Sequence, residues 1–333
     1  MKQKLLLMFI SLSLLGSGFA QSTGGGITVN RVPDFVYTGA PITPAITLRD
    51  GQKTMQKDKD FTLEYKNNVN VGTATIVISL KGNYEGTQTR EFKINKAKIT
   101  VVTDAGQGKV YGQAEPTLAY KIGAGELKAK DAFTGALTRD PGENAGDYNI
   151  TQGTLSAGDN YELTVIRNKF TITKAPLLIK ANAGQSKVYG QKDPPLKYTL
   201  EGGSLVGKDA LTGELSRSEG ENAGNYPITL GSLSAGSNYD IKFTNDAFEI
   251  KKADITVRPE PNQSKVYGSP DPIFKYTVTQ GAMVGGDLFR GMLGRSPGED
   301  VGKYPITEGS LSPGPNYNMK FESVPFEIVR KTF

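Results

Sequence analysis

The sequence contains no cysteine, no histidine and no tryptophan. Without cysteine the chain can form no disulfide bond, and without cysteine and histidine it lacks a thiol nucleophile and the commonest transition-metal ligands. The missing histidine also removes the usual general base at neutral pH. These absences exclude most familiar hydrolase mechanisms. We therefore expect a protein that is not an enzyme, with no catalytic residue, no cofactor and no bound metal.

Long apolar runs are absent beyond the first 20 residues. The chain starts with Lys2 and Lys4, continues with an apolar run over 5–15, and has small residues at Gly18 and Ala20. This pattern is typical of an export signal, and the run is shorter than the roughly 20 residues of a membrane-spanning helix. We therefore expect a signal peptide at 1–20, no membrane span after its removal, and a chain that is secreted or lies at the cell surface.

Charge of one sign is not concentrated anywhere. The 39 basic and 34 acidic residues give a net charge of +5 and are scattered along the chain. A nucleic-acid partner would need a clustered basic face, so none is expected. The partners that remain are an extracellular glycan or protein, and the sequence fixes no oligomeric state.

A long internal repeat is the main feature that the sequence does have. Lys-Val-Tyr-Gly occurs at 109–112, 187–190 and 265–268, a constant step of 78 residues. A weaker form of the same markers precedes them, with Tyr37-Thr-Gly39 and Gly82-Asn-Tyr84. The repeat predicts four modules: a divergent module 1 at 24–95, module 2 at 96–174, module 3 at 175–252 and module 4 at 253–333.

Apolar residues alternate within each module, as in Leu196, Tyr198 and Leu200. A period of two is typical of half-buried strands, and we expect six or seven short ones per module. The predicted fold is mainly β: a tandem linear array of four small modules, each β-grasp-like or an Ig-like sandwich with at most one short helical turn. That turn is expected where an aspartate would cap it and a glycine would close it, at Asp131 and Gly135, Asp209 and Gly213, and Asp287 and Gly291.

The junctions between modules contain no Gly/Ser linker, so neighbouring modules are expected to touch. At the third junction Phe248 and Ile250 have even numbers, whereas Ile255 and Val257 have odd ones. A slip of one residue exchanges the two faces of a strand. The sequence therefore predicts a bulge or bend at 252–253, and likewise at 96–97 and 174–175.

Several motifs recur in a fixed order in modules 2 to 4. They are Lys-Val-Tyr-Gly, an acidic-Pro pair such as Asp193-Pro194, Ala-Gly-x-Tyr-x-Ile-Thr, Asn-Tyr, and a closing Phe-x-Ile-x-Lys-Ala; in module 4 Val301 replaces the alanine of the third motif, and Arg330 follows in place of the closing lysine. Over 96–333 this combination resembles the MBG domain, in its YGX type, of bacterial surface and extracellular proteins. The resemblance implies a tandem repeat of adhesin-like proteins, with no catalytic residues to carry over.

The repeated tyrosines Tyr111, Tyr189 and Tyr267 are the candidate ligand-binding residues, as a platform on which sugars would stack. The alternative is that these rings fill the core and bond their hydroxyls, while the glycine that follows supplies a turn with positive φ. The run 57–60 has two aspartates and is a weak candidate for calcium, with a solvated turn as the alternative. Lys174 and Asn160 are a weak candidate pair for an isopeptide bond.

One opposite-charge spacing also recurs: Arg139 with Glu143, Arg217 with Glu221, and Arg295 with Glu299. We interpret each as a local surface ion pair worth about 0 to 1 kcal/mol. The leading functional hypothesis is a non-enzymatic stalk, spacer or adhesive scaffold. The alternative is a soluble multivalent binding protein for a glycan or a host extracellular protein.

Overall fold

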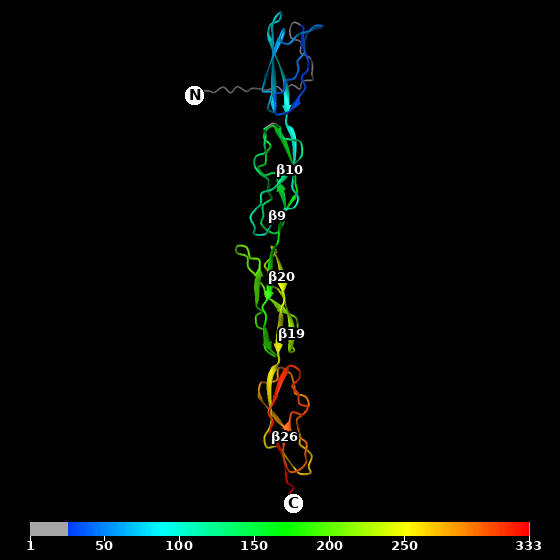
Figure 1. Ribbon diagram of the computed structural model, residues 1–333, viewed down its shortest axis with the longest axis vertical. Coiled ribbons are helices and arrows are strands. Elements are labelled where there is room, and N and C mark those ends of the chain that lie inside the picture. Colours follow the sequence, from blue (N-terminus) through cyan, green and yellow to red (C-terminus); the bar gives the residue numbers. More distant parts are fainter. Residues whose placement is uncertain (1–25, 129, 333) are drawn as a thin grey trace, which may run out of the picture. The chain divides into compact units, whose positions relative to one another are not determined.

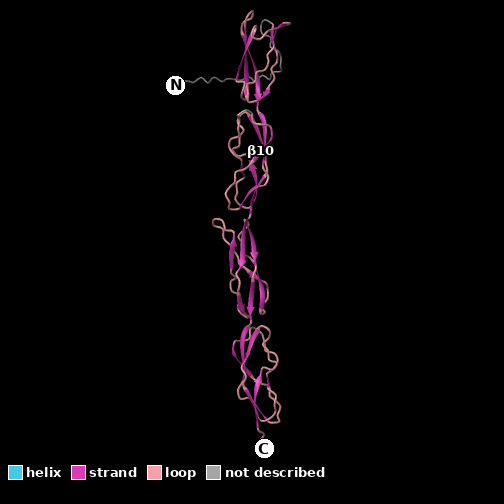
Figure 2. Cartoon of the chain, viewed as in Figure 1, coloured by secondary structure: helices cyan, strands magenta, loops and turns pink. Residues whose placement is uncertain are grey.

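A computed structural model describes residues 26–128 and 130–332 (Figure 1). These residues form strands, turns and loops and contain no helix, which confirms the prediction of a mainly β fold (Figure 2). It follows that no helix among them could span a lipid bilayer. The predicted signal peptide lies outside the described residues. The predicted module numbers are kept as labels, and the boundaries stay a prediction.

The described residues belong to two compact units. The second unit consists of the short segment Val110–Gln113 and of the residues from Thr173 onward. In the second unit, module 3 has a three-stranded and a four-stranded sheet. Their strand orders are β17(Tyr198–Gly202)-β15(Ala175–Ala181)-β20(Tyr239–Thr244) and β16(Ser186–Val188)-β21(Ala247–Lys251)-β19(Gly224–Thr229)-β18(Ser216–Arg217). Module 4 repeats them as β24(Tyr276–Gln280)-β22(Ala253–Pro259)-β27(Tyr317–Phe321) and β23(Ser264–Val266)-β28(Pro325–Val329)-β26(Gly302–Thr307)-β25(Gly294–Arg295).

In module 2 the same two sheets recur as β10(Tyr120–Ala124)-β8(Ala97–Thr103)-β13(Tyr161–Ile166) and β11(Thr138–Arg139)-β12(Gly146–Thr151)-β14(Lys169–Thr173)-β9(Gln107–Val110). Module 1 differs. Its sheets are β1(Ile27–Val29)-β3(Leu48–Asp50)-β4(Lys53–Thr54) and β2(Phe35–Val36)-β7(Thr87–Asn95)-β6(Gly72–Leu80)-β5(Phe61–Lys66). Each module thus has seven strands in the described residues, within the predicted six or seven.

The two sheets of a module share one core. In module 3, Ile179 of β15 packs in one buried cluster with Ile228 of β19 and with Phe248 and Ile250 of β21. Along β15 every second residue is buried, because successive side chains of a strand point to opposite faces. A core between two facing sheets is the arrangement of the sandwich, which was one of the two predicted alternatives.

The predicted breaks at the junctions are confirmed. β21 ends at Lys251 and β22 begins at Ala253, so Lys252 belongs to neither strand, and the chain passes from the four-stranded sheet of module 3 into the three-stranded sheet of module 4. Ile250 before the break and Ile255 after it are both buried. Lys96 and Lys174 separate consecutive strands in the same way.

The predicted helical turn is wrong. The segment 205–215 has no helical residue, and Thr212 instead pairs with Ser234 through two backbone hydrogen bonds of 2.8 and 2.9 Å. Gly213 does adopt a positive φ of 79°, and a Cβ there would overlap the carbonyl oxygen of Ser232. Long-range pairing has therefore overridden the local preference, and Asp209 uses its carboxylate on tyrosine hydroxyls instead of capping a helix.

Candidate functional site

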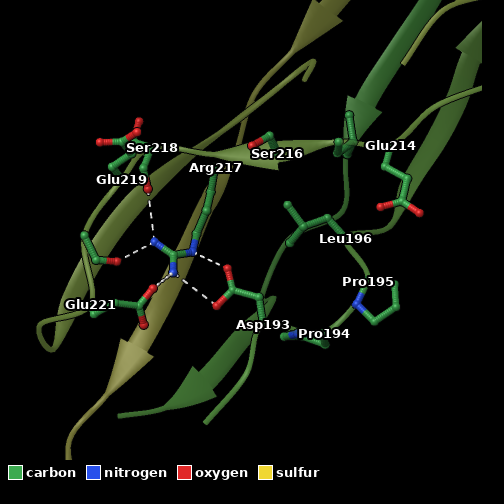
Figure 3. A pocket seen from close by; sticks show the side chains of 12 residues that line it. Asp193, Pro194, Pro195, Leu196, Glu214, Ser216, Arg217, Ser218, Glu219 and Glu221 are labelled. Atoms are coloured by element: carbon green, nitrogen blue, oxygen red, sulfur yellow. Dashed lines mark hydrogen bonds and ion pairs between the residues drawn. The ribbon is translucent and has the colours of Figure 1, made fainter. Parts of the chain in front are cut away.

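A cluster of four charged side chains recurs in modules 2 to 4, and Figure 3 shows most of it in module 3. Arg217 extends from β18 and donates Nε and Nη2 to the two carboxylate oxygens of Asp193, at 2.6 and 3.1 Å. Its Nη2 also donates to Glu221, and its Nη1 donates to the carbonyl oxygens of Ser218 and Gly220. All five N–H groups of the guanidinium therefore have an acceptor.

Lys187, on β16, completes the cluster. Its ammonium bonds Asp193 at 2.7 Å and also bonds Glu221, so each carboxylate lies between two cations. The side chains of Lys187 and Arg217 are only 3% and 7% exposed, whereas Asp193 and Glu221 are 37% and 66% exposed. Two buried positive charges are thus neutralised by two carboxylates that remain in contact with water.

The predicted local Arg–Glu ion pair is present, and it is one part of a larger cluster in which the two cations are buried. The equivalent members are Lys109, Glu115, Arg139 and Glu143 in module 2, and Lys265, Asp271, Arg295 and Glu299 in module 4. Removal of one partner from such a cluster destabilises the fold, because a buried charge left unpaired has lost its hydration without compensation.

Two aromatic rings on neighbouring strands lie close to the arginine. The guanidinium carbon of Arg217 lies 5.1 Å from the ring centroid of Tyr226 and 5.4 Å from that of Phe248. Tyr226 donates its hydroxyl to the carbonyl oxygen of Asn222, which fixes the ring. A Cβ at Gly220 would overlap this ring, so the glycine in the Gly-Glu-Asn-Ala-Gly motif is needed for the close approach. The charged cluster thus packs against the hydrophobic core of the module, to which Phe248 belongs.

An open groove of about 600 Å³ runs over this cluster, lined by Asp193, Pro195, Leu196 and Arg217 among others (Figure 3). A groove of about 500 Å³ occupies the same place in module 4, beside Ile273 and Phe274. Because the guanidinium of Arg217 has already used its five donors within the chain, it has none left to direct at a ligand. The groove also offers the apolar surface of the residues that follow the acidic one, Pro195 and Leu196 in module 3 and Ile273 and Phe274 in module 4.

The carboxylates of the cluster have lowered pKa values. Hydrogen bonds from Arg139 and Lys109 outweigh burial and lower the pKa of Glu115 to about 2, and the same contact with Glu115 raises the pKa of Lys109. A carboxyl group whose pKa is lower in the folded state stabilises the fold at pH values above its unfolded pKa. That stabilisation is lost as the pH falls through the folded value.

We therefore expect module 2 to lose stability between about pH 4.5 and pH 2, as Glu115 becomes protonated. Equilibrium unfolding in urea at a series of pH values measures this loss. In the variant Glu115→Gln the residue at this position no longer titrates, so the dependence on pH should be shallower over the same range. An unchanged slope would contradict the assignment.

A second recurring arrangement joins consecutive modules. Between modules 3 and 4, Tyr189 donates its hydroxyl to Oδ2 of Asp287 at 2.9 Å, and Tyr317 donates to the same oxygen at 2.7 Å. The hydroxyl of Tyr317 also accepts the backbone N–H of Val284. The two rings meet edge to face, with centroids 5.5 Å apart and planes at 80°. We call this set of one aspartate and two tyrosines the joint.

The same joint occurs at the other two junctions with nearly the same distances. Tyr37 and Tyr161 donate to Asp131 at 2.9 and 2.7 Å, and Tyr111 and Tyr239 donate to Asp209 at 2.9 and 2.7 Å. Burial is the main cause that raises the pKa of Tyr161 to about 12, and the bond to Asp131 adds to it. The hydroxyl of Tyr161 therefore stays protonated, and able to donate, at pH values above the ordinary tyrosine pKa of 10.

The predicted tyrosines now divide into two groups. Tyr111 and Tyr189 lie in joints with their hydroxyls bonded, whereas Tyr267 is 49% exposed. Stacking of sugars on these rings stays a prediction, and of the three residues only Tyr267 is this exposed. Sequence reasoning did not connect the tyrosines with the aspartates, although Tyr189 and Asp287 recur with the same 78-residue step as Tyr111 and Asp209.

An asparagine reinforces the first and third junctions. Oδ1 of Asn316 accepts the backbone N–H of Ala223 at 2.9 Å, and its Nδ2 donates to Asn222. Asn160, the candidate for an isopeptide bond, similarly bonds Val71 and Asn70, while Lys174 is exposed. The amide of Asn160 thus serves the junction.

The weak calcium candidate has a structural role. Asp60 is 7% exposed, and its Oδ2 accepts the backbone N–H of Gln56 at 2.8 Å, which closes a turn. Within 26–128 and 130–332 no three acidic residues come together in a way that could hold a metal ion. The turn around Asp58, which has a positive φ of 64°, accounts for the run of two aspartates.

The similar solved structures include a cell adhesion molecule with several Ig domains and a cadherin. The eight N-terminal Ig domains of Down Syndrome Cell Adhesion Molecule match with 10% identity and a TM-score of 0.22, covering 92% of this chain and 55% of that one. Drosophila N-cadherin EC1-4 matches with 9% identity and a TM-score of 0.22, covering 90% and 99%. The chain thus spans about half the length of the first structure. Scores this low carry no functional argument.

No curated protein matches this chain. A protein-family model does match: the model of the MBG domain (YGX type) fits residues 99–171, 177–249 and 255–326. The three matched segments make up more than half of the chain, and each contains one charged cluster and one aspartate of a joint. The chain therefore belongs to the family of the MBG domain (YGX type).

Proposed function

We propose that this chain is a non-enzymatic secreted or cell-surface repeat protein that acts as a stalk, spacer or adhesive scaffold. The joint is the observation that carries the proposal. Each junction has the same carboxylate accepting one tyrosine from each side, and one residue separates the last strand of one module from the first strand of the next. Identical junctions make the length of an array grow in equal steps, as a spacer requires.

The chemistry of the charged cluster supports a structural role. Proton transfer needs a group that can reach a substrate, whereas the guanidinium of Arg217 donates all its N–H groups to the chain itself. The cluster also recurs with nearly the same distances in three modules, as expected of a feature that each module needs in order to fold.

Small-angle X-ray scattering tests the proposal. Four modules of about 30 Å in a line would span about 120 Å and give a radius of gyration near 35 Å, whereas a compact chain of this length would give about 20 Å. We expect the larger value. The variant with Asp131, Asp209 and Asp287 all changed to alanine should show a broader distribution of distances. A radius of gyration near 20 Å for the unmodified chain would rule the stalk out.

The alternative is a soluble multivalent binding protein for a glycan or an extracellular protein. The repeated groove favours it, because Ile273 is 85% exposed beside Phe274 at this groove in module 4. A glycan and extracellular-protein binding screen with the full chain and with Ile273→Ser tests it. If the full chain binds a ligand and Ile273→Ser weakens that binding, this role is supported. If the full chain binds nothing in the screen, the result counts against it.

A further inference from the structure

Module 4 carries the donor half of a joint, to which no other part of the described chain is bound. Tyr267 occupies the position of Tyr189, and its backbone N–H bonds Val329 at 2.9 Å as that of Tyr189 bonds Lys251 at 2.8 Å. Tyr267 is 49% exposed. Within the described residues its backbone N–H has a bonding partner, and its hydroxyl has none. The backbone of Tyr267 is therefore placed as in the complete joints, but the described residues supply no acceptor for its hydroxyl.

The glycine after each tyrosine shows the same difference. A Cβ added at Gly190 would contact the side chain of Val284 in the next module, and one at Gly112 would contact Val206. Gly268 has nearly the same φ, 84° against 83° at Gly190, yet a Cβ there meets nothing within 4 Å. We call the surface formed by Val266, Tyr267 and Gly268 the donor face. Among residues 26–128 and 130–332, nothing makes the polar or the apolar contacts of a joint with this face.

Module 1 carries the acceptor half. Tyr84 donates its hydroxyl to Oδ2 of Asp50 at 3.2 Å, and it follows Asn83 just as Tyr161 follows Asn160 in module 2. Asp50 pairs with Ile27 at the start of β1, the first strand of this module. In the described residues this carboxylate accepts one tyrosine, whereas Asp131 accepts two. We call Asp50 and Tyr84 the acceptor face.

We propose that copies of this chain associate head to tail, with the donor face of one copy on the acceptor face of the next. Tyr267 of one copy donates its hydroxyl to Asp50 of another and completes a fourth joint of the kind that the chain builds three times internally. A contact between two different faces leaves one of each free at the ends, so the assembly continues as a linear oligomer. This inference goes beyond the proposed stalk, which one chain forms alone.

The two faces fit each other better than they fit a general partner. Every complete joint unites one tyrosine from the preceding module with an aspartate and a tyrosine of the following one, and the unmatched halves supply these same groups. The intermolecular joint lacks the covalent connection that raises the effective concentration of the internal ones. Association should therefore be weak and should increase with protein concentration.

Two variants, each blocked at one face, test the proposal in the full chain, expressed with its leader so that any processing takes place. Tyr267→Glu puts a negative charge opposite Asp50 and leaves the acceptor face intact, whereas Asp50→Ala removes the acceptor and leaves the donor face intact. In sedimentation velocity up to about 1 mM, the weak end of specific binding, the unmodified chain should form oligomers larger than dimers. Each variant alone should be a monomer, and an equimolar mixture should form a dimer and no larger species.

The exposed apolar residue Ile273 provides the control, because Ile273→Ser lies outside the donor face and should associate like the unmodified chain. An unmodified chain that stays monomeric overturns the proposal, as does association that survives in both single variants or a mixture that stays monomeric. X-ray scattering of the monomeric variants reports the internal joints separately. Loss of association with an unchanged radius of gyration would thus leave the stalk intact.

Discussion

Replacing Arg217 with alanine is expected to lower the free energy of unfolding of module 3 by about 3 to 4 kcal/mol, toward the lower end for a broken buried pair because its carboxylates can regain water. The substitution leaves Lys187 as the one cation beside two carboxylates, removes donors from two backbone carbonyls and removes the contacts with the rings of Tyr226 and Phe248. Urea unfolding measures the effect through the midpoint and slope of the transition.

Two controls separate the parts of this effect. Arg217→Lys keeps the charge but lacks the planar guanidinium that bonds a carboxylate with two N–H groups. Its free energy of unfolding should therefore lie between those of Arg217→Ala and the unmodified chain. Lys320→Ala breaks an ion pair of 3.5 Å whose side chains are 74% and 41% exposed, and it should cost less than about 0.5 kcal/mol. A loss below about 1 kcal/mol for Arg217→Ala would mean that the cluster is not a stabilising element.

Replacing Asp287 with alanine is the change expected to uncouple modules 3 and 4. Two tyrosine hydroxyls lose a charged acceptor, at about 1.5 kcal/mol each or about 3 kcal/mol together. In an array of repeats an interface of this kind makes neighbours unfold together. The variant should therefore show two resolved transitions for these modules in calorimetry or urea unfolding, where the unmodified chain shows one.

Tyr189→Phe removes one of the two bonds of this joint and should have about half the effect. The matched control is Asp147→Ala, because Asp147 is exposed and accepts a single bond from Thr171 on the surface of module 2. A stable, coupled pair of modules in Asp287→Ala would show that apolar contacts alone hold the junction.

The features that could be predicted from the sequence depend on local patterns. Alternation at Leu196, Tyr198 and Leu200 indicated a strand, and β17 begins at Tyr198. The change from even to odd positions between Ile250 and Ile255 indicated a break, and Lys252 lies outside both strands. Both inferences work because a strand exposes its faces with a period of two, which neighbouring residues alone determine.

The contacts of the site join residues far apart in the sequence, which local patterns do not reach. Tyr189 and Asp287 are 98 residues apart, and Lys187 and Glu221 are 34 apart. Each of these residues recurs in the repeat, but recurrence does not say which recurring residue contacts which. Asp209 was interpreted as a helix cap for this reason, since its actual partners, Tyr111 and Tyr239, come from other parts of the chain.

The parallel pairing of β15 with β20 has a mechanical consequence. β15 is the first strand of module 3, β20 leads directly into its last strand, and six residue pairs connect the two from Ala175 to Lys180. Tension applied at the two ends of the module pulls these neighbours in opposite directions along their length. The bonds are then loaded in shear and must break together, so that each module should resist stretching better than a hairpin opened from one end.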